Sequence, residues 1–303
     1  MKPRIVSIGE VLWDLFPQGA VLGGAAANFA LHARAFGGDA RLISRVGNDS
    51  LGFQVIQDFR KSGFPTEFIA VDPLAETGVV SVDLGADGQP MYRIAPNVAW
   101  DQMVVERAAL EEVERADAVC FGSLAQRSPV SRETIRTLVG VSRTEALRVF
   151  DINLRQDYFS REVIEASLEL ANVLKLNDGE LPVLAELFNL KGVPAVQLAE
   201  LARRFELRGV VYTRGAHGSL LWVDGVLDEH SGISTEVRDT VGAGDSFTAA
   251  VVMGLLNGMP LPEVHQTANE VAAFVCSQSG ATPALPENLL HRFHNFPIQQ
   301  LFR

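Results

Sequence analysis

Residues 239–245 of this 303-residue chain, Asp-Thr-Val-Gly-Ala-Gly-Asp, place two glycines and a carboxylate immediately before an apolar run. Apolar residues within 246–256 recur at helical spacing, so we expect Gly242 and Gly244 in a tight turn that opens a helix. Glycines there let backbone N–H groups approach an anion, and the positive end of the helix favours negative charge. Asp245 is itself an anion, and beside such a turn it can take a proton from a hydroxyl that attacks a phosphoryl group. The segment therefore predicts phosphoryl transfer.

A second glycine-rich segment, residues 23–28 (Gly-Gly-Ala-Ala-Ala-Asn), also precedes a helical pattern. Its glycines, Gly24 among them, permit close backbone approach, and Asn28 can both donate and accept hydrogen bonds toward a polyol. Asp14, ten residues before Gly24, can accept the protons of two sugar hydroxyls. These three residues are candidates for binding a sugar.

Polar residues also follow several expected strands, where ligands bind in open α/β sheets. Residues 151–155, Asp-Ile-Asn-Leu-Arg, end one strand, and residues 177–180, Asn-Asp-Gly-Glu, follow the next. Oxygen groups at that place suit a hydrated Mg²⁺ near phosphate. Residues 213–218, Thr-Arg-Gly-Ala-His-Gly, connect two expected strands and offer backbone contacts to nucleotide phosphates.

Each segment also has a purely structural interpretation. Asp and Asn are good N-caps, so Asp245, Asn28 and Asp178 would then only start helices, and Asp14 would be a solvated surface residue. His32 and His265 have no partner at metal-ligand spacing, which favours structural or solvent-facing roles. The sequence contains neither Gly-x-x-x-x-Gly-Lys-[Ser/Thr] nor Gly-x-Gly-x-x-Gly, so it is not a P-loop enzyme and lacks the dinucleotide fingerprint.

Together the motifs resemble those of the ribokinase-like (PfkB) carbohydrate kinases. Residues 23–47 and 239–250 are similar to the two signatures of that family, Asn177-x-x-Glu180 is similar to its Asn-x-x-Glu motif, and the likeness extends over residues 4–286. The resemblance implies ATP as phosphoryl donor, Mg²⁺ as cofactor and a possible requirement for K⁺. It implies Asp245 as catalytic base, with an anion hole formed by Gly242, Ala243 and Gly244.

The resemblance also assigns binding residues. The sugar would be held by Asp14, Gly24, Asn28, Asn153 and Arg155. The nucleotide would be bound by Thr213, Gly215 and Gly218, with Asn269 near the adenine. Mg²⁺ would be held through water by Asn177 and Glu180, and a monovalent cation by Asp239, Val241 and Gly280.

Several substrates are compatible with the resemblance. Ribokinases usually carry Lys where Ala25 stands, whereas residues 10–16 and the Asp151-x-Asn153-x-Arg155 motif look more like the fructokinase branch. We therefore expect transfer of the ATP γ-phosphoryl group to a primary hydroxyl of a monosaccharide, with fructose first. Arg155 would also suit a carboxylate, which keeps 2-keto-3-deoxygluconate kinase second, with ribokinase or a nucleoside kinase third. The alternative of another class is a non-catalytic regulator that binds sugar or nucleotide.

Short β-rich runs alternate with helical patterns, which predicts one doubly wound α/β domain over residues 1–303, with a mainly parallel sheet and helices on both faces. The main strands are expected at 4–8, 40–46, 118–121, 148–151, 173–176 and 210–213. The helices between them are expected at 28–36, 53–62, 131–141, 163–171 and 179–188. Residues 10–22 and about 77–95 lack crossover helices and predict a small antiparallel β lid, with turns at 17–19 and 85–88.

Composition narrows the classes of partner. The chain is 47% hydrophobic and 21% charged with a formal net charge of −11, and its lack of a basic run argues against nucleic acid and anionic membranes as partners. It has no apolar stretch long enough to span a bilayer, and its first residues meet charge too early for a secretory signal. Cys120 and Cys276 are expected to be free thiols in a reducing cytosol. These features predict a cytoplasmic protein, with lid edges that are candidates for a homodimer contact.

Overall fold

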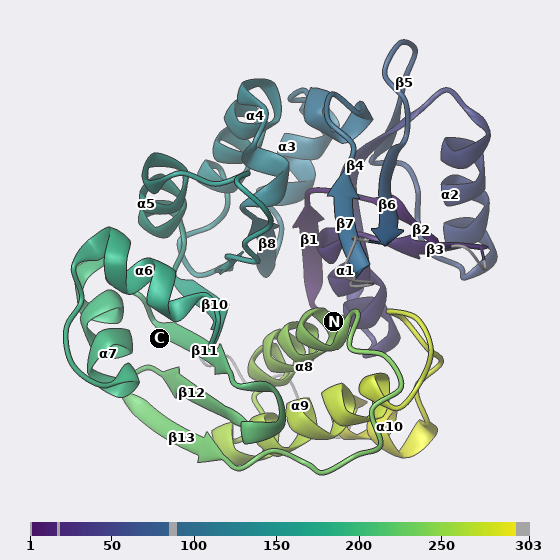
Figure 1. Cartoon of the computed structure of the whole chain (residues 1–303). Coiled ribbons are helices and arrows are strands. Elements are labelled where there is room, and N and C mark those ends of the chain that lie inside the picture. Colours follow the sequence, from purple (N-terminus) through teal and green to yellow (C-terminus); the bar gives the residue numbers. More distant parts are fainter. Residues whose placement is uncertain (1, 17–18, 85–89, 295–303) are drawn as a thin grey trace.

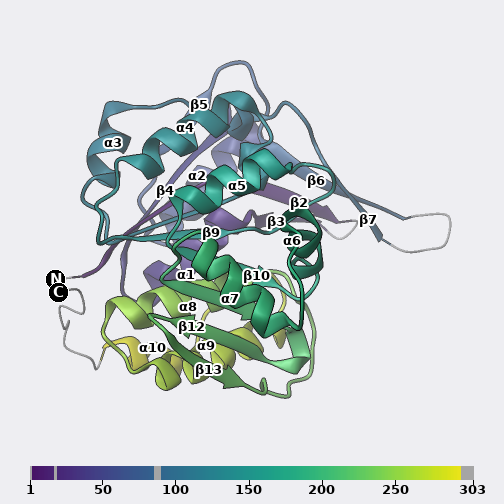
Figure 2. The ribbon, with the colours of Figure 1, turned by 90° about the vertical axis from the view of Figure 1, so that its left-hand side faces the viewer.

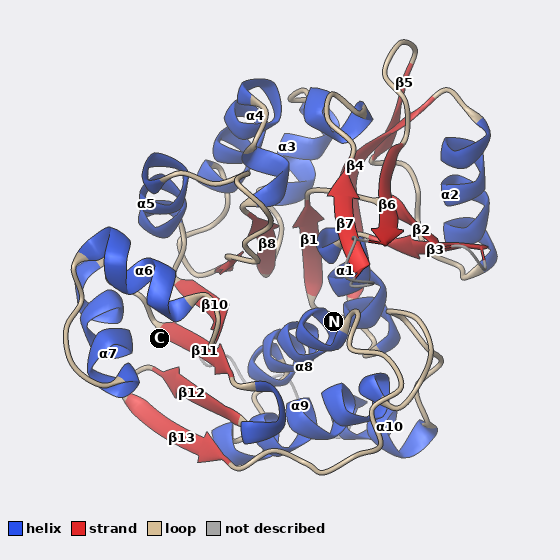
Figure 3. Cartoon of the chain, in the orientation of Figure 1, coloured by secondary structure: helices blue, strands red, loops and turns tan. Residues whose placement is uncertain are grey.

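A nine-stranded sheet forms the centre of the computed structural model, which describes residues 2–16, 19–84 and 90–294 (Figures 1 and 3). The strand order is β13-β12-β11-β10-β9-β8-β1-β4-β5. The strands are β1 (Arg4–Ile8), β4 (Asp39–Gly47), β5 (Ile69–Asp72), β8 (Ala118–Gly122), β9 (Leu147–Asp151), β10 (Val173–Asn177), β11 (Gly209–Thr213), β12 (Ser219–Val223) and β13 (Val226–His230). All pairs from β5 to β11 are parallel, which confirms the predicted sheet, and β12 and β13 extend it as antiparallel edge strands.

Helices cover both faces of this sheet, as the alternating pattern predicted. They are α1 (Ala25–Ala35), α2 (Ser50–Lys61), α3 (Arg107–Val113), α4 (Pro129–Gly140), α5 (Arg161–Leu170), α6 (Leu181–Phe188), α7 (Pro194–Arg204), α8 (Ala243–Leu256), α9 (Leu261–Cys276) and α10 (Glu287–His294). Short 3₁₀ turns lie at η1 (Ala99–Gln102), η2 (Leu124–Gln126) and η3 (Gly215–His217).

Neighbouring residues of each central strand point to opposite faces and feed two apolar layers. Val6, Phe121 and Leu174 pack with α3 to α7 on one face. Ile5, Cys120 and Val173 pack with α1, α2 and α8 to α10 on the other. Because parallel strands are buried on both faces, they consist almost entirely of apolar residues. A charged residue inside such a strand is therefore informative.

The second sheet has four strands in the order β3-β2-β6-β7: β2 (Leu12–Phe16), β3 (Gly19–Gly23), β6 (Gly78–Leu84) and β7 (Pro90–Ile94). The predicted lid hairpins β2–β3 and β6–β7 are antiparallel, whereas β2 and β6 pair in parallel where the two hairpins meet. A hairpin turn dictates direction only within its own pair, so the central pairing depends on how the hairpins approach. Figure 2 shows β6 and β7 projecting beyond the main sheet. The predicted turn at 85–88 and residues 17–18 of the other turn lie outside the described residues.

Two further predictions concern the state of the cysteines and the presence of membrane-spanning helices. Cys120 and Cys276 are both free thiols, as expected. In the portion of the chain that the structure describes, no helix is both long and apolar enough to cross a membrane.

Candidate active site

The glycine-rich turn before α8 has the geometry of an anion-binding turn. Gly242 is the N-cap of α8 and adopts a left-handed backbone with φ of 77°. A Cβ at Gly242 would overlap the backbone of Ala281, so only glycine fits this conformation beside that loop. The first N–H groups of a helix have no intrahelical acceptor; here they belong to Ala243, Gly244 and Asp245, and that of Ala243 contacts the carbonyl oxygen of Thr240 at 3.3 Å. The turn therefore offers donors and the positive helix end to a negatively charged ligand.

Asp245 lies in the first turn of α8 and is held by a residue from another helix. The side-chain amide of Asn28, in the first turn of α1, donates a 2.8 Å hydrogen bond to Oδ2 of Asp245. Gly24 is the N-cap of α1, so neither Asn28 nor Asp245 caps its helix and the capping interpretation of both is wrong. The candidate base, Asp245, and a candidate sugar-binding residue, Asn28, are thus in direct contact, as an active site requires.

The surroundings of Asp245 suit a proton acceptor. Burial raises the pKa of its carboxyl to about 6, and the charge of Asp151 adds to this rise. The charge of Lys175, the bond from Asn28 and the charge of Arg155 all oppose it. A carboxylate with a pKa near 6 is ionised at neutral pH and remains basic enough to take a proton in a transition state.

The predicted sugar residues converge from the lid and the main sheet. Asp14, on β2, is half-buried; burial raises its pKa to about 6, while Arg155 lowers it and Asp239 raises it further. The same Arg155 lowers the pKa of Asp245, so its guanidinium lies within electrostatic reach of both acids. Gly24 has φ of 106°, and a Cβ there would lie 2.5 Å from the carbonyl oxygen of Glu10. Asn153 adopts φ of 37°, a backbone conformation that non-glycine residues rarely occupy outside functional or strained sites.

Asn177 and Glu180 are the residues predicted to hold Mg²⁺ through water. Their hydrogen bonds connect the end of β10 with the segment that follows β9. Glu180 accepts hydrogen bonds from the N–H of Leu154 at 2.9 Å and from the N–H of Asn177 at 2.8 Å. Asn177 Oδ1 accepts from the N–H groups of Gly179 and Glu180 at 2.9 and 3.0 Å. Each Glu180 oxygen accepts one of these bonds and keeps a second lone pair, which suits contact with the water shell of Mg²⁺, whereas both lone pairs of Asn177 Oδ1 are already used. Among the described residues, no group of three His, Cys, Asp or Glu side chains is placed to hold a metal ion.

The predicted nucleotide residues lie along the connection from β11 to β12. Gly215 and Gly218 have φ of 53° and 80°, and a Cβ at Gly218 would overlap the backbone at His230. Thr213 ends β11, where its carbonyl accepts from the N–H of Asp178 at 2.9 Å. Asn269 of α9 is buried, and its amide donates to Ser219 Oγ at 3.0 Å and to the His265 carbonyl at 2.9 Å. Asn269 therefore joins the group through Ser219, the residue after Gly218.

The three predicted monovalent-cation residues are brought together by one carboxylate. Asp239 accepts from the N–H of Val241 at 3.0 Å through Oδ1 and from the N–H of Gly280 at 3.1 Å through Oδ2. The N–H groups of Arg238 and Asp239 both donate to the carbonyl of Cys276. The loop after α9 is thus fastened to the segment that leads into the anion turn.

A model of the pfkB family of carbohydrate kinases matches residues 18–288. The chain belongs to this family. An uncharacterized sugar kinase from Pyrococcus horikoshii is 31% identical over 312 residues, covering 95% of each chain. Its crystal structure with ATP superposes with a TM-score of 0.77 over 92% of this chain and 95% of that one, at 30% identity. An Escherichia coli fructokinase is 26% identical and covers 94% of this chain and 97% of its own. A fructokinase double mutant from Vibrio cholerae, solved with fructose, ADP and potassium ion, shares the fold with a TM-score of 0.79 at 24% identity, over 96% of this chain and 98% of that one.

This pfkB kinase has two charged residues in the site to which the sequence interpretation gave no role, Glu10 and Lys175, and Lys175 pairs with Asp151 of the predicted 151–155 motif. Glu10 is buried, accepts from the N–H of Ala25 at 3.1 Å, and has a pKa raised to about 7 by burial. Asp151 and Lys175 form a buried ion pair. The signal was present in each case, because Glu10 follows an apolar strand and Lys175 interrupts Val-Leu-Lys-Leu within one.

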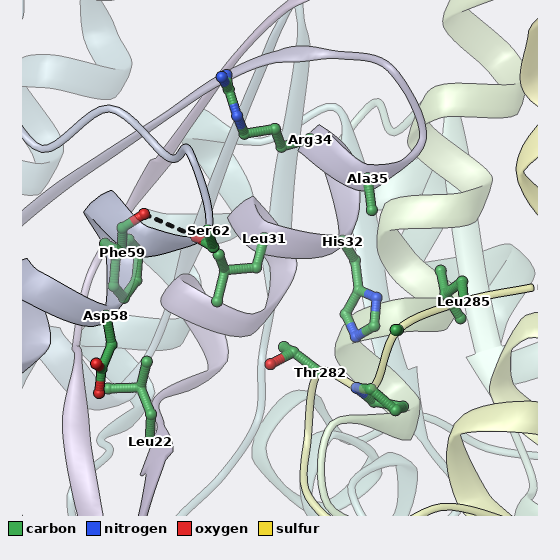
Figure 4. Close-up of a pocket in the computed structure, with 12 residues that line it drawn as sticks. Leu22, Leu31, His32, Arg34, Ala35, Asp58, Phe59, Ser62, Thr282 and Leu285 are labelled. Carbon is green, nitrogen blue, oxygen red and sulfur yellow. Dashed lines mark hydrogen bonds between the residues drawn. The ribbon is translucent and has the colours of Figure 1, made fainter.

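His32 connects helix α1 with the loop at Ala281, next to the glycine-rich turn of the kinase site. It is buried one helical turn after Asn28 on α1, and its Nε2 lies 2.9 Å from the carbonyl oxygen of Ala281, the residue against which Gly242 packs. Burial lowers the pKa of His32 to about 4. The ring lines a cavity of about 330 Å³ between α1, α2 and the loop at 282–285, where Figure 4 shows it beside Thr282 and Leu285. His32 is therefore a neutral structural residue, in agreement with the expectation for its role.

Proposed function

We propose that this kinase transfers the γ-phosphoryl group of ATP to a primary hydroxyl of a ketohexose, with fructose as the first candidate. The observation that carries the proposal is that Asn28 donates to Asp245 at the anion turn, while Arg155 lies within electrostatic reach of both Asp245 and Asp14. The matches to fructokinases and the fructokinase-like motifs at 10–16 and 151–155 support the choice of sugar.

In the proposed reaction, the Asp245 carboxylate accepts the proton of the sugar hydroxyl as its oxygen attacks the γ-phosphorus. The bond between the γ-phosphorus and the bridging oxygen breaks, and ADP leaves with the electron pair. Backbone N–H groups at 242–244 would stabilise the charge on the transferring group, where fixed donors are most effective. Asp14 and Asn28 would orient the sugar, and closure of the lid sheet would exclude water as a competing acceptor.

Two cations belong to the proposal. Mg²⁺ bound with the nucleotide would neutralise phosphate charge, and Asn177 and Glu180 would hold its water shell. Asp239, Val241 and Gly280 would hold K⁺, an assignment supported by the way the Asp239 carboxylate joins the two loops beside the anion turn. Thr213, Gly215, Gly218 and Asn269 would bind the nucleotide.

An acidic sugar is the second candidate, and the environment of Arg155 favours it. Its side chain is exposed, and no acidic side chain among the described residues lies within 4 Å of it. Its N–H contacts the carbonyl oxygen of Leu154 at 3.2 Å. Such a guanidinium is available for the carboxylate of 2-keto-3-deoxygluconate. Ribose and nucleosides remain third.

Location and assembly complete the proposal. We infer a cytoplasmic enzyme, because Cys120 and Cys276 are both free thiols, as expected in a reducing compartment. Strand β3 is at the edge of the lid sheet and its first three residues are exposed, which suits a homodimer contact between lids. Light scattering after size exclusion would give the mass directly.

The deciding experiment is ATP-dependent ADP release with Mg²⁺, with and without K⁺, against fructose, 2-keto-3-deoxygluconate, ribose, tagatose, glucose and adenosine. The highest kcat/KM is expected with fructose. Preference for the keto-deoxy acid would keep the chemistry and assign a carboxylate to Arg155. Sugar binding by calorimetry without ADP release on any acceptor would favour the non-catalytic regulator.

A further inference from the structure

A buried ion pair lies beneath the proposed site. Nζ of Lys175 on β10 is 2.9 Å from Oδ1 of Asp151 on β9, and the two side chains are only 6% and 8% exposed. The strands are adjacent and parallel, with Lys175 directly opposite Asp151 in the register. Burying two charges is costly, and an apolar pair of similar volume would stabilise such a position as well or better. The pair therefore calls for an explanation other than stability.

The ammonium group lies directly behind the anion turn. A Cβ at Gly244 would be 3.1 Å from Nζ of Lys175 and 3.8 Å from its Cε, so the absence of a side chain at 244 lets the ammonium approach the turn. Asp151 Oδ1 is the one hydrogen-bond acceptor found for Nζ within the described parts of the chain. An ammonium has three donors, so its charge is only partly used by Asp151.

Carboxylates surround this cation. Burial lowers the pKa of Lys175, but the charges of Asp151, Glu180 and Asp245 more than compensate and raise it above its usual value. Acting in the other direction, Lys175 lowers the pKa of Asp245 while Asp151 raises it. Several charged, titratable or hydrogen-bonding groups face Asp245 or the Lys175–Asp151 ion pair. They are Glu10 after β1, Asn28 on α1, Cys120 on β8, Asp151 on β9, Arg155 in the following loop, Lys175 on β10 and Glu180 before α6.

We propose that Lys175, paired with Asp151, is a positioning residue for phosphoryl transfer, which keeps positive charge directly behind the anion turn and balances the carboxylates around Asp245. The inference rests on the proposed function, in which Asp245 is the base. Lys175 touches neither sugar nor nucleotide in this account. It acts through the turn at 242–244 and through the ionisation of Asp245.

The test compares Lys175→Met, Asp151→Asn and the double variant by the pH dependence of kcat/KM on the preferred sugar. Loss of the cation raises the pKa of Asp245, so the acidic limb of Lys175→Met moves to higher pH by about one unit. Loss of the neighbouring anion moves the limb of Asp151→Asn to lower pH. The double variant returns the limb close to that of the wild type. Its plateau kcat stays about tenfold or more below wild type, because the charge behind the turn is missing.

Lys61→Met is the matched control, since Lys61 Nζ forms a pair of the same 2.9 Å length with Asp58 on the exposed surface of α2. Its pH profile and kcat should equal those of the wild type. A folded Lys175→Met with an unmoved limb and normal kcat overturns the inference, as do single variants whose limbs move in the same direction. If Lys175→Met does not fold, an unmoved limb in Asp151→Asn or a wild-type kcat in the double variant overturns it instead. An inactive wild type, or an active Asp245→Asn, would defeat the proposed function itself and so separates the two failures.

Discussion

The amide of Asn28 donates a 2.8 Å hydrogen bond to the carboxylate of Asp245, although the two residues are 217 positions apart. Both lie in the first turn of their helices, and α1 and α8 pack side by side (Figure 1). The residue proposed to hold the sugar therefore also orients the proposed base. Any change that separates α1 from α8 should affect binding and proton transfer together.

Replacing Asp245 by Asn should abolish turnover without unfolding the protein. We expect kcat to fall by roughly 10²–10⁴, because an amide cannot accept the hydroxyl proton. At pH 7 the melting temperature should rise, since a carboxylate whose pKa is raised by burial destabilises the folded state when ionised. Steady-state kinetics and a thermal melt on the same preparation check both points. Turnover close to wild type would rule out Asp245 as the base.

Replacing Asn28 by Ala should weaken catalysis through Asp245 as well as sugar binding. The lost hydrogen bond lowers the pKa of Asp245 in the wild type, so its removal should move the acidic limb of kcat/KM to higher pH. We expect kcat to fall about tenfold and the sugar KM to rise. Asn288→Ala, at an exposed position of α10, is the control and should leave both constants unchanged. A higher KM with an unmoved limb would show that Asn28 serves the sugar alone.

Activity of the wild type should decline as the pH falls through about 6. Asp245 must be a carboxylate to accept a proton, and its pKa is about 6, so protonation below that value removes the base. Asp14 also has a pKa of about 6, and its protonation would weaken sugar binding over the same range. Asp14→Asn should therefore leave the limb in kcat near pH 6 while raising the sugar KM. A kcat that is constant from pH 7 to 5 would contradict the assignment of the base.

Gly242→Ala should damage the anion turn more than the fold. Gly242 combines φ of 77° with direct packing on Ala281, so a methyl group there strains the turn at a cost of about 1–3 kcal/mol. We expect kcat to fall by about 100-fold. Gly140→Ala at the end of α4 has open space and an ordinary backbone, so it should keep full activity and lose no stability. Urea unfolding with kinetics separates the two effects, and a fully active Gly242→Ala would remove the turn from the mechanism.

His32 should make the fold sensitive to mild acid. Its pKa is about 4 in the folded protein and 6.5 as a free side chain. Between these two pH values His32 is therefore protonated in the unfolded chain but neutral in the folded protein. The contribution of His32 to the free energy of unfolding should consequently fall between pH 6.5 and 4, by up to about 3 kcal/mol. Glu10, Asp14 and Asp245 contribute with opposite sign, because their raised pKa values make their folded forms less costly as pH falls. The difference between wild type and His32→Gln, measured by urea unfolding at pH 7 and 5, isolates the histidine and should shrink at pH 5.

Local features of the site were predictable from sequence because their causes are local. Glycine readily adopts the left-handed backbone that precedes a helix here, so the place of Gly242 at the start of α8 could be predicted from residues 239–256 alone. The alternation of apolar runs with helical patterns likewise determined a parallel sheet covered on both faces. The functional class followed from these motifs, since their order along the chain already matched one family.

Contacts between distant strands and helices were decided only by the tertiary structure. Strand order places Lys175 opposite Asp151 and behind Gly244, and helix packing brings His32 to Ala281. The parallel pairing of β2 with β6 likewise depends on how two hairpins meet, which their own turns do not encode. Local sequence records which residues are charged, apolar or free of a side chain. The neighbours that shift a pKa or balance a buried charge come from far along the chain, so only the folded arrangement determines them.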